Sequence, residues 1–236
     1  MPTSAQWLEA RAGTDALPWS ALVNLVRIAQ EELDLDADGK PGAKTMAALS
    51  SRVDERYKAA PPVPKNRAEV KRVFGDPSWV KLPRGRAVDL DDEWERKNIR
   101  WFRLHTGKRV RFHRLIGDEF VRVFKLACAR SGYTPKSVQT YVPRIIGGTN
   151  RLSFHSYGIS FDVDPADNPW SGRRKDGSLS LLRQNPEFIR AFEENHWGWG
   201  GRWKSKKGKA QWGDDMHFEY RSRRSWIGVP IPGADE

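Results

Sequence analysis

The spacing of apolar residues changes along the chain and predicts where helices and strands lie. Between Ala21 and Val53 the apolar positions recur at intervals of three and four, which is the pattern of one buried helix face. The residues of this stripe are Leu22, Leu25, Val26, Ala29 and Leu33. A polar turn, DLDADGKPG, follows, and AKTMAALSSRV then predicts a second short helix. This part of the chain therefore predicts a compact pair of helices.

The turn between these helices superficially resembles the start of a calcium-binding loop. It contains Asp34, Asp36 and Asp38, followed by Gly39. A loop of the EF-hand type needs a bidentate glutamate at its twelfth position, and Thr45 stands there in this chain. The sequence therefore favours a polar connection over a calcium site.

A proline-rich stretch separates the helical pair from the rest of the chain. Within residues 58–67, prolines occupy positions 61, 62 and 64, and charged residues flank them. Prolines at this density restrict the backbone and favour a semi-rigid linker. We therefore predict a helical module over residues 1–57, a linker over 58–67 and a larger domain over 68–236.

Helical and strand-like patterns are interspersed beyond the linker. The run IGDEFVRVFKLACARSGY predicts a helix that ends at Gly132, and PEFIRAFEENHWGW predicts another with Pro186 in its first turn. Short strand-like runs lie between and after these helices, and no internal repeat is present. The larger domain is therefore expected to be α+β, with helices packed against a small antiparallel sheet.

The composition indicates a folded protein with a basic surface. Eleven Trp and ten Phe in 236 residues give a capacity for burial that disordered chains lack. Lys and Arg outnumber Asp and Glu by 41 to 30, so the formal net charge is +11. That charge favours polyanions such as nucleic acid, anionic lipid or cell wall. The basic residues are spread along the chain without a recognition motif, which argues against a specific nucleic-acid partner.

The cysteine count and the hydropathy pattern indicate whether the chain can form disulfides, span a membrane or carry an export signal. Cys128 is the single cysteine and lies in a predicted helix, so no intramolecular disulfide forms and a buried structural thiol is expected. No segment has the roughly 18 apolar residues of a membrane span, and the first residues lack the pattern of a signal peptide. We expect a monomer that is made in the cytoplasm without an export signal.

Two strand-like runs each place polar side chains opposite apolar ones. Strand alternation puts Asp162 of ISFDVD on one polar face, and His217 and Glu219 of GDDMHFEYR on another. The apolar residues of the two runs are Ile159, Phe161 and Val163, and Met216, Phe218 and Tyr220. The apolar faces can seal against a core, so each strand presents a metal-capable side chain to a cleft.

A second histidine lies close to the first of these strands. His155 stands seven residues before Asp162 and just ahead of a turn at Gly158, so a strand–turn–strand path can bring it back toward the carboxylate. Two His and one Asp fit a catalytic zinc site, which uses three protein ligands and keeps a position for water. Structural zinc more often has four ligands, commonly with Cys. On spacing alone, ordinary hydrogen-bonded histidines remain the alternative.

The same residues carry a family resemblance. SFHSYGISFD resembles the S-x-H-x-x-G-x-x-x-D signature of the zinc peptidases that act as D-Ala-D-Ala carboxypeptidases and L-Ala-D-Glu endopeptidases on the peptidoglycan stem peptide. WGWGGRWKSKKGKAQWGDDMHFEY is similar to the second element of that family, a W-G-G-x-W run followed by D-x-x-H-F-E. The segments VFGDP, FHRLIGDEFVRVF and DVDPADNP agree in order, and the resemblance spans about residues 70–222.

The resemblance implies the parts of an active site. It implies one zinc ion per chain, held by His155, Asp162 and His217. It also implies Asp214 as the general base, at a place where some members have Glu and the L-Ala-D-Glu branch commonly has Asp; the adjacent Asp215 is out of register. Bound zinc lowers the pKa of water toward ~7 and polarises a carbonyl. The cation should also lower the pKa of Asp214 unless burial opposes it.

Three further residues are expected to assist the active site, and their roles have alternatives. Arg144 matches an arginine with which the family binds substrate or stabilises the oxyanion, and the alternatives are Arg151 or a purely structural Arg144. Glu219 is expected to accept a hydrogen bond from a ligand imidazole and so orient it, with a salt bridge at the rim as the alternative. Ser153 is a further candidate for hydrogen bonding near the site. His105, His113 and His196 fall outside the implied ligand set.

The tryptophans near the second motif allow two interpretations. They either form the wall of the cleft or pack an irregular loop in the usual aromatic manner. These residues are Trp197, Trp199, Trp203 and Trp212.

The helical pair also carries a resemblance. AQEELDLDADGKPGAKTMAAL is similar to the second half of a small peptidoglycan-binding module, in which a D-G-x-x-G-x-K-T turn joins two helices. The similarity covers about thirty residues, and the residues before Leu22 do not match the first half of such a module. A structural helical cap is the alternative.

Together the resemblances imply a peptidoglycan hydrolase that cuts the L-Ala to D-Glu bond. A wall peptidase without an export signal is typical of a phage endolysin that reaches the wall after the membrane is breached, held there by anionic wall or envelope polymers. A prophage protein or a bacterial enzyme exported by another route would have the same sequence features. The functional alternatives are a D-Ala-D-Ala carboxypeptidase and a catalytically idle wall-binding protein. Manganese or cobalt could replace zinc.

Overall fold

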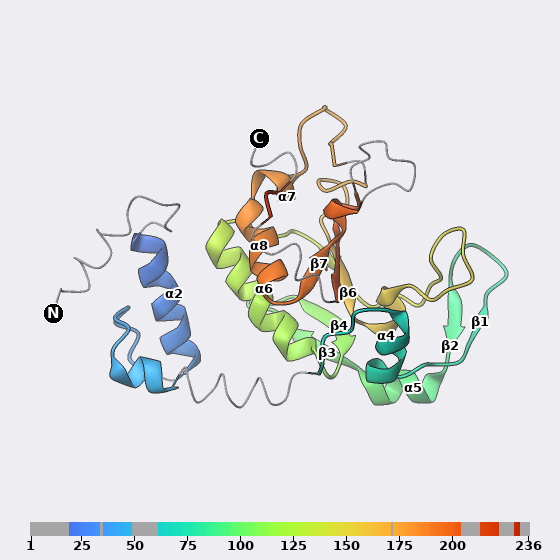
Figure 1. Cartoon of the computed structure of the whole chain (residues 1–236), viewed down its shortest axis with the longest axis horizontal. Coiled ribbons are helices and arrows are strands. Elements are labelled where there is room, and N and C mark those ends of the chain that lie inside the picture. The colour runs from blue at the N-terminus through green and yellow to red at the C-terminus, as the bar shows by residue number, and fades with distance from the viewer. Residues whose placement is uncertain are drawn as a thin grey trace. The chain divides into compact units, whose positions relative to one another are not determined.

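The computed structural model of the chain divides into two compact units, Met1–Ala59 and Ala60–Glu236, and each is described by itself (Figure 1). None of the described helices is long and apolar enough to cross a membrane. The structure describes residues 19–33, 35–48, 61–170, 172–203, 213–221 and 229–231.

The N-terminal unit contains helix α2 (Trp19–Glu32), and residues 43–48 are also helical. The buried side chain of Gln30 closes the turn between them. Its Nε2 donates to Asp38 Oδ1 at 2.8 Å and to Thr45 Oγ1 at 3.1 Å, while its Oε1 accepts from the Gly39 N–H at 2.8 Å. The Asp38 carboxylate is therefore used inside the turn, as expected for a polar connection.

The helices of the larger unit begin and end at residues suited to those positions. Asn66 and Asp91 accept hydrogen bonds from the first-turn N–H groups of α4 and α5. Helix α6 ends at Gly132 in the left-handed conformation, and α8 begins with Pro186, as the sequence predicted. The helices are α4 (Arg67–Phe74), α5 (Asp92–Asn98), α6 (Gly117–Ser131), α7 (Leu181–Gln184) and α8 (Pro186–Glu194).

All strand pairs among the described residues are antiparallel, which confirms the predicted α+β class. Two hairpins are formed by β1 (Trp79–Lys81) with β2 (Val88–Leu90) and by β3 (Ile99–Arg103) with β4 (Arg109–His113). A four-stranded sheet has the order β5-β6-β8-β7. Its strands are β5 (Val138–Gln139), β6 (Ser160–Val163), β8 (His217–Tyr220) and β7 (Trp197–Trp199).

The core fills the apolar face of this sheet. Phe161 of β6 and Phe218 of β8 stack with ring centroids 4.9 Å apart, and Phe120 of α6 and Phe192 of α8 pack against Phe161. Helices α6 and α8 pack together over this face (Figure 1). Each fully buried Phe contributes about 1.5–3 kcal/mol by leaving water. With this face sealed, the polar residues of β6 and β8 lie on the other side.

Cys128 of α6 belongs to this core. Its side chain is buried, and burial raises the pKa of the thiol to about 12. A thiol that stays protonated is unreactive, so the structural role expected for Cys128 is confirmed.

Part of the predicted linker belongs to the larger unit. The Pro61 carbonyl accepts from the Tyr220 hydroxyl at 3.4 Å, and the Lys65 carbonyl accepts from the Arg221 guanidinium at 3.2 Å. These bonds attach residues 61–65 to the end of β8. Residues 58–60 lie outside the described residues, and the linker boundaries stay a prediction.

Candidate metal centre

The register of the central sheet brings two of the candidate ligands together. β6 and β8 pair so that Asp162 lies directly opposite His217. Opposed residues on one face of an antiparallel pair have Cβ atoms about 4.5–5.5 Å apart. Asp162 Oδ1 and His217 Nδ1 are 2.9 Å apart. Strand alternation in the sequence predicted that both side chains lie on polar faces. The pairing of β6 with β8 puts these two polar faces on the same side of the sheet.

His155 reaches the same point from a short 3-10 turn, η1 (Phe154–Tyr157). Ser153 caps this turn, because its hydroxyl accepts from the His155 N–H at 3.4 Å. Gly158 ends the turn with φ +63°, and a Cβ there would lie 2.7 Å from the backbone nitrogen of His113. Only glycine fits this position without displacing backbone. Ser153 therefore acts on the turn that carries His155 rather than on the imidazole.

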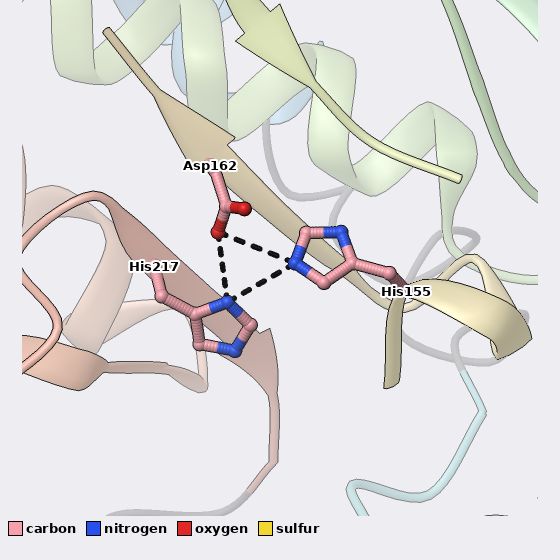
Figure 2. Close-up of side chains that lie close together, drawn as sticks. All are labelled: His155, Asp162 and His217. Carbon is pink, nitrogen blue, oxygen red and sulfur yellow. Dashed lines mark hydrogen bonds and ion pairs between the residues drawn. The ribbon is translucent and has the colours of Figure 1, made fainter. Parts of the chain in front are cut away.

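Three side chains converge on one point, as Figure 2 shows. His155 Nε2 is 3.2 Å from Asp162 Oδ1 and 3.2 Å from His217 Nδ1. In a tetrahedral site with zinc–ligand bonds of 2.0–2.1 Å, neighbouring ligand atoms are about 3.3 Å apart. Two imidazole nitrogens and a carboxylate oxygen are also a donor set that suits zinc. This buried group could therefore hold a metal ion.

The outward nitrogen of each imidazole faces an acceptor. His155 Nδ1 donates to the Thr140 carbonyl at 2.6 Å, which keeps the proton on Nδ1 and leaves the Nε2 lone pair facing the cluster. His217 Nε2 lies 3.8 Å from Glu219 Oε2. Acceptors at these positions orient imidazole ligands and raise their basicity. Thr140 was missed by sequence reasoning because a backbone carbonyl leaves no side-chain signal.

The ionisable side chains of the cluster shift one another's pKa values. Burial lowers the pKa of His155. Burial opposes protonation of His217 as well, but Asp162 and Glu219 outweigh it and raise the pKa of His217 to about 10. Burial alone would raise the pKa of Asp162, yet the two imidazoles hold that pKa well below its usual range. The carboxylates of Asp162 and Glu219 thus concentrate negative charge beside the imidazoles, which would stabilise a cation bound there.

Asp214 is fixed by backbone contacts just before β8. Its N–H donates to the Gly200 carbonyl at 3.0 Å, and its carbonyl accepts from the His217 N–H at 3.1 Å. A Cβ at Gly213 would lie 2.0 Å from the Gly200 oxygen, so the two backbone segments touch. Gly200 belongs to η2 (Gly200–Arg202), which directly follows β7. Both segments that frame Asp214 are therefore attached to the central sheet.

The Asp214 carboxylate is desolvated. Its Oδ1 is buried and makes no hydrogen bond in the part of the chain that the structure describes. Burial raises the pKa of Asp214, the nearby Asp162 raises it further, and His217 and Arg144 oppose the rise. A carboxylate with free acceptor capacity and a raised pKa is suited to take a proton.

The adjacent Asp215 lies in a different environment. Its carboxylate accepts from Arg183 Nε at 2.7 Å and Arg183 Nη2 at 2.7 Å, and also from the Ser180 hydroxyl. Both charged side chains are 0% exposed. The Asp215 carbonyl also accepts from Trp199 Nε1 at 2.7 Å. This geometry gives Asp215 a structural role, in agreement with its register in the sequence.

Arg144 lies beside the cluster. Its Nη2 is 3.9 Å from Asp162 Oδ2, and 25% of its side chain is exposed. Its backbone N–H donates to the Ser156 hydroxyl at 2.8 Å, which ties it to the turn that carries His155. Arg151, the alternative cation, is exposed, and its carbonyl accepts from the Ile146 N–H. Of the two arginines, Arg144 is the one that contacts a candidate ligand.

The tryptophans near the second motif have different positions. Trp197 and Trp199 are fully buried in the core, which supports the packing interpretation for both. The ring of Trp203 lies 5.1 Å from the ring of His217, so this residue adjoins the cluster. Trp212 lies outside the described residues.

The other histidines do not join the cluster. His113 is buried, and its Nε2 lies 3.3 Å from the Phe74 carbonyl. His105 packs against Phe124, and His196, two residues after the end of α8, adopts a positive φ of 71°. In the described part of the chain, the group that could hold a metal consists of His155, Asp162 and His217.

Comparison with known families agrees with this geometry. Residues 147–220 match a family model described as D-alanyl-D-alanine carboxypeptidase. The matched segment contains Asp214 and all three residues of the cluster, and it supports a peptidase of this family. Searches of curated proteins and of solved structures gave no match.

Proposed function

We propose that the protein is a zinc-dependent peptidase that hydrolyses the L-Ala to D-Glu bond of the peptidoglycan stem peptide. The observation that carries the proposal is the convergence of His155 Nε2, Asp162 Oδ1 and His217 Nδ1 inside the segment that matches the peptidase family. The choice of bond rests on two features of the branch that the chain resembles, Asp214 and the W-G-G-x-W run.

Asp214 is the proposed proton carrier of the reaction. Zinc, when bound, would lower the pKa of a water ligand and polarise the scissile carbonyl. Asp214 would accept the proton of that water and pass it to the leaving amine. Its unbonded Oδ1 provides the acceptor, and burial raises its pKa above that of an exposed aspartate.

Other residues would hold the reacting groups in place. Arg144, next to Asp162 and partly open to solvent, would bind the oxygen that becomes negatively charged during attack. Glu219 would orient His217, and the Thr140 carbonyl would orient His155. These groups are fixed on strands and a capped turn, so the site is preorganised before substrate binds.

Mass spectrometry of digested peptidoglycan tests the proposal. We expect the protein to release stem peptides that begin at D-Glu, and we expect a chelator to stop the release and added zinc to restore it. Intact stem peptides across several wall chemistries would overturn the catalytic proposal and leave a binding protein.

A D-Ala-D-Ala carboxypeptidase is the second candidate, because the matched family model carries that description. The same digest separates the two reactions. A carboxypeptidase would remove one terminal alanine from a pentapeptide stem and release no free stem peptide.

We also propose that the protein serves as a phage endolysin, with the N-terminal unit binding the wall. Addition of the purified full-length protein to intact and to membrane-permeabilised bacteria tests this role. We expect a fall in turbidity only after permeabilisation, and no fall in the presence of a chelator. If neither sample lysed, the endolysin role would be contradicted. The identity of the bond that is cut would still be decided by the digest.

A further inference from the structure

The hairpin of β3 and β4 carries an aromatic and basic outer face. Trp101 lies opposite Arg111, and Arg103 lies opposite Arg109. Strand alternation places these four side chains on one face, and Val110 and Phe112 of β4 are buried on the other. The Trp101 face is defined here as Trp101, Arg103, Arg109 and Arg111.

Trp101 is an exposed aromatic ring with two arginine side chains close to it. It is 58% exposed. The Arg109 guanidinium lies 4.8 Å from its ring centroid, and the Arg111 guanidinium lies 5.8 Å away. Arg111 also lies 4.7 Å from the Tyr141 ring. These cation–π contacts hold the rings and guanidinium groups in a fixed array at the surface.

The charge of this face is only partly neutralised. Arg103 and Arg109 are cross-strand partners, and like charges in directly opposed positions destabilise a strand pair. Among the described residues, neither one forms an ion pair with a carboxylate. Glu95 pairs with Arg111 and also accepts from the Tyr141 hydroxyl. A bound polyanion would neutralise the charge that the fold leaves uncompensated.

Two hydrogen bonds through Thr140 connect β4 of the hairpin to the candidate metal centre. The Arg111 N–H donates to Thr140 Oγ1 at 3.2 Å, and the Thr140 carbonyl accepts from His155 Nδ1 at 2.6 Å. One residue therefore links the hairpin to a candidate metal ligand.

We propose that the Trp101 face binds a polyanionic glycan, a sugar chain that carries phosphate groups. The exposed ring offers a flat apolar surface for a sugar ring, and the guanidinium forks match phosphate oxygens. Single-stranded nucleic acid is usually bound by several stacking rings along a basic groove, whereas this face has one exposed ring, Trp101. The proposal does not depend on the peptidase activity.

Titration calorimetry with the full-length protein tests this binding. The probes are a soluble, glycosylated poly(glycerol phosphate), single-stranded DNA at equal phosphate concentration, and neutral dextran. We expect the phosphate glycan to bind, with a Kd that rises with salt, and dextran to bind far more weakly. None of these probes contains the stem peptide, so the result is independent of the reaction proposed above.

Matched variants locate the site on the hairpin. We expect Trp101→Ala to raise the Kd about fivefold, as the loss of roughly 1 kcal/mol of ring contact implies. Trp170→Ala is its control, because Trp170 is 57% exposed. Arg103→Glu with Arg109→Glu should raise the Kd at least about tenfold. Arg72→Glu with Lys175→Glu changes the net charge equally at two other exposed positions and should have a smaller effect.

Several outcomes would overturn the proposal. Equal effects of Trp101→Ala and Trp170→Ala, or of the two double charge reversals, would show that net charge alone attracts the glycan. Tighter binding of DNA than of the glycan would identify a nucleic-acid surface instead. Thermal unfolding of each variant, expected to match the parent protein, excludes misfolding as the cause of weaker binding.

Discussion

Asp214 and Asp215 are neighbours in the chain but lie in opposite physical environments. Asp215 is paired with Arg183, accepts from Ser180 and has no exposed surface. Asp214 is also largely buried, yet its Oδ1 makes no hydrogen bond within the described residues. Burial raises the pKa of both carboxyls, and only Asp215 has a cation in direct contact.

The difference separates a group that stabilises the fold from one that is available for chemistry. A buried ion pair with complete hydrogen bonding has no capacity left for a substrate, and breaking it leaves a charge without a partner. A desolvated carboxylate without a partner costs stability and retains its basicity. Substitutions at these two positions should therefore have opposite consequences.

Asp214→Asn should produce the largest effect on activity. We expect peptide-bond hydrolysis to fall by about 10²–10⁴-fold, the range typical for loss of a general base, while stability stays equal or rises. Rates of peptide release and a denaturant titration measure the two quantities. Activity within tenfold of the parent enzyme would show that another group takes the proton.

Asp215→Asn should mainly lower stability. The change leaves the Arg183 guanidinium buried without its carboxylate, so we expect a loss of about 3–5 kcal/mol in the free energy of unfolding. Urea denaturation measures this loss. The double variant Asp215→Asn with Arg183→Met should recover part of it. A single variant as stable as the parent protein would contradict the structural role of the pair.

His113 extends the comparison to a buried imidazole. Its neutral form is bonded on both sides, because Nε2 faces the Phe74 carbonyl and Nδ1 accepts from the Leu115 N–H. Burial lowers the pKa of His113 from 6.5 to about 4, so the unfolded chain binds the proton more tightly. This contribution to stability is complete above pH 6.5 and is lost as the pH falls toward 4.

The expected loss from His113 is about 3 kcal/mol between these two pH values. Urea denaturation of the parent protein and of His113→Gln, across that interval, measures it. The variant should show a smaller slope of stability against pH. Equal slopes would mean that His113 is not the titrating group.

Glu219→Gln should have the smallest effect and tests the orientation of His217. The amide keeps the size of the side chain but removes the charge near Nε2, so we expect metal affinity to fall by about 10–100-fold. Zinc titration with a competing chelator measures the affinity directly. Glu187→Gln, on α8, is a matched control that should leave it unchanged.

Local patterns in the sequence were sufficient to predict the helices around Gly132 and Pro186 and the polar faces that carry Asp162 and His217. Apolar periodicity and alternation determine these features within a few residues. Ligand roles for these residues stay predictions, although the three side chains converge. The α+β class also follows from the mixture of patterns.

Contacts between distant segments could not be predicted in the same way. The Arg183–Asp215 pair joins positions 32 residues apart, and the bond from His155 to the Thr140 carbonyl depends on backbone placement. The Trp101 face requires the register of β3 on β4, which sequence alone leaves open. Burial of Trp197 and Trp199 likewise depends on where β7 joins the sheet.

The contact between Gly200 and Gly213 has a consequence for protein engineering. The two ends of the segment 201–212 are held together at its base, where the backbones touch and the Asp214 N–H bonds to the Gly200 carbonyl. Loop-closure entropy grows slowly with length, so insertions between these anchors carry a small thermodynamic penalty. An insertion between the two glycines would therefore keep the backbone contacts that hold Asp214 and His217 in place.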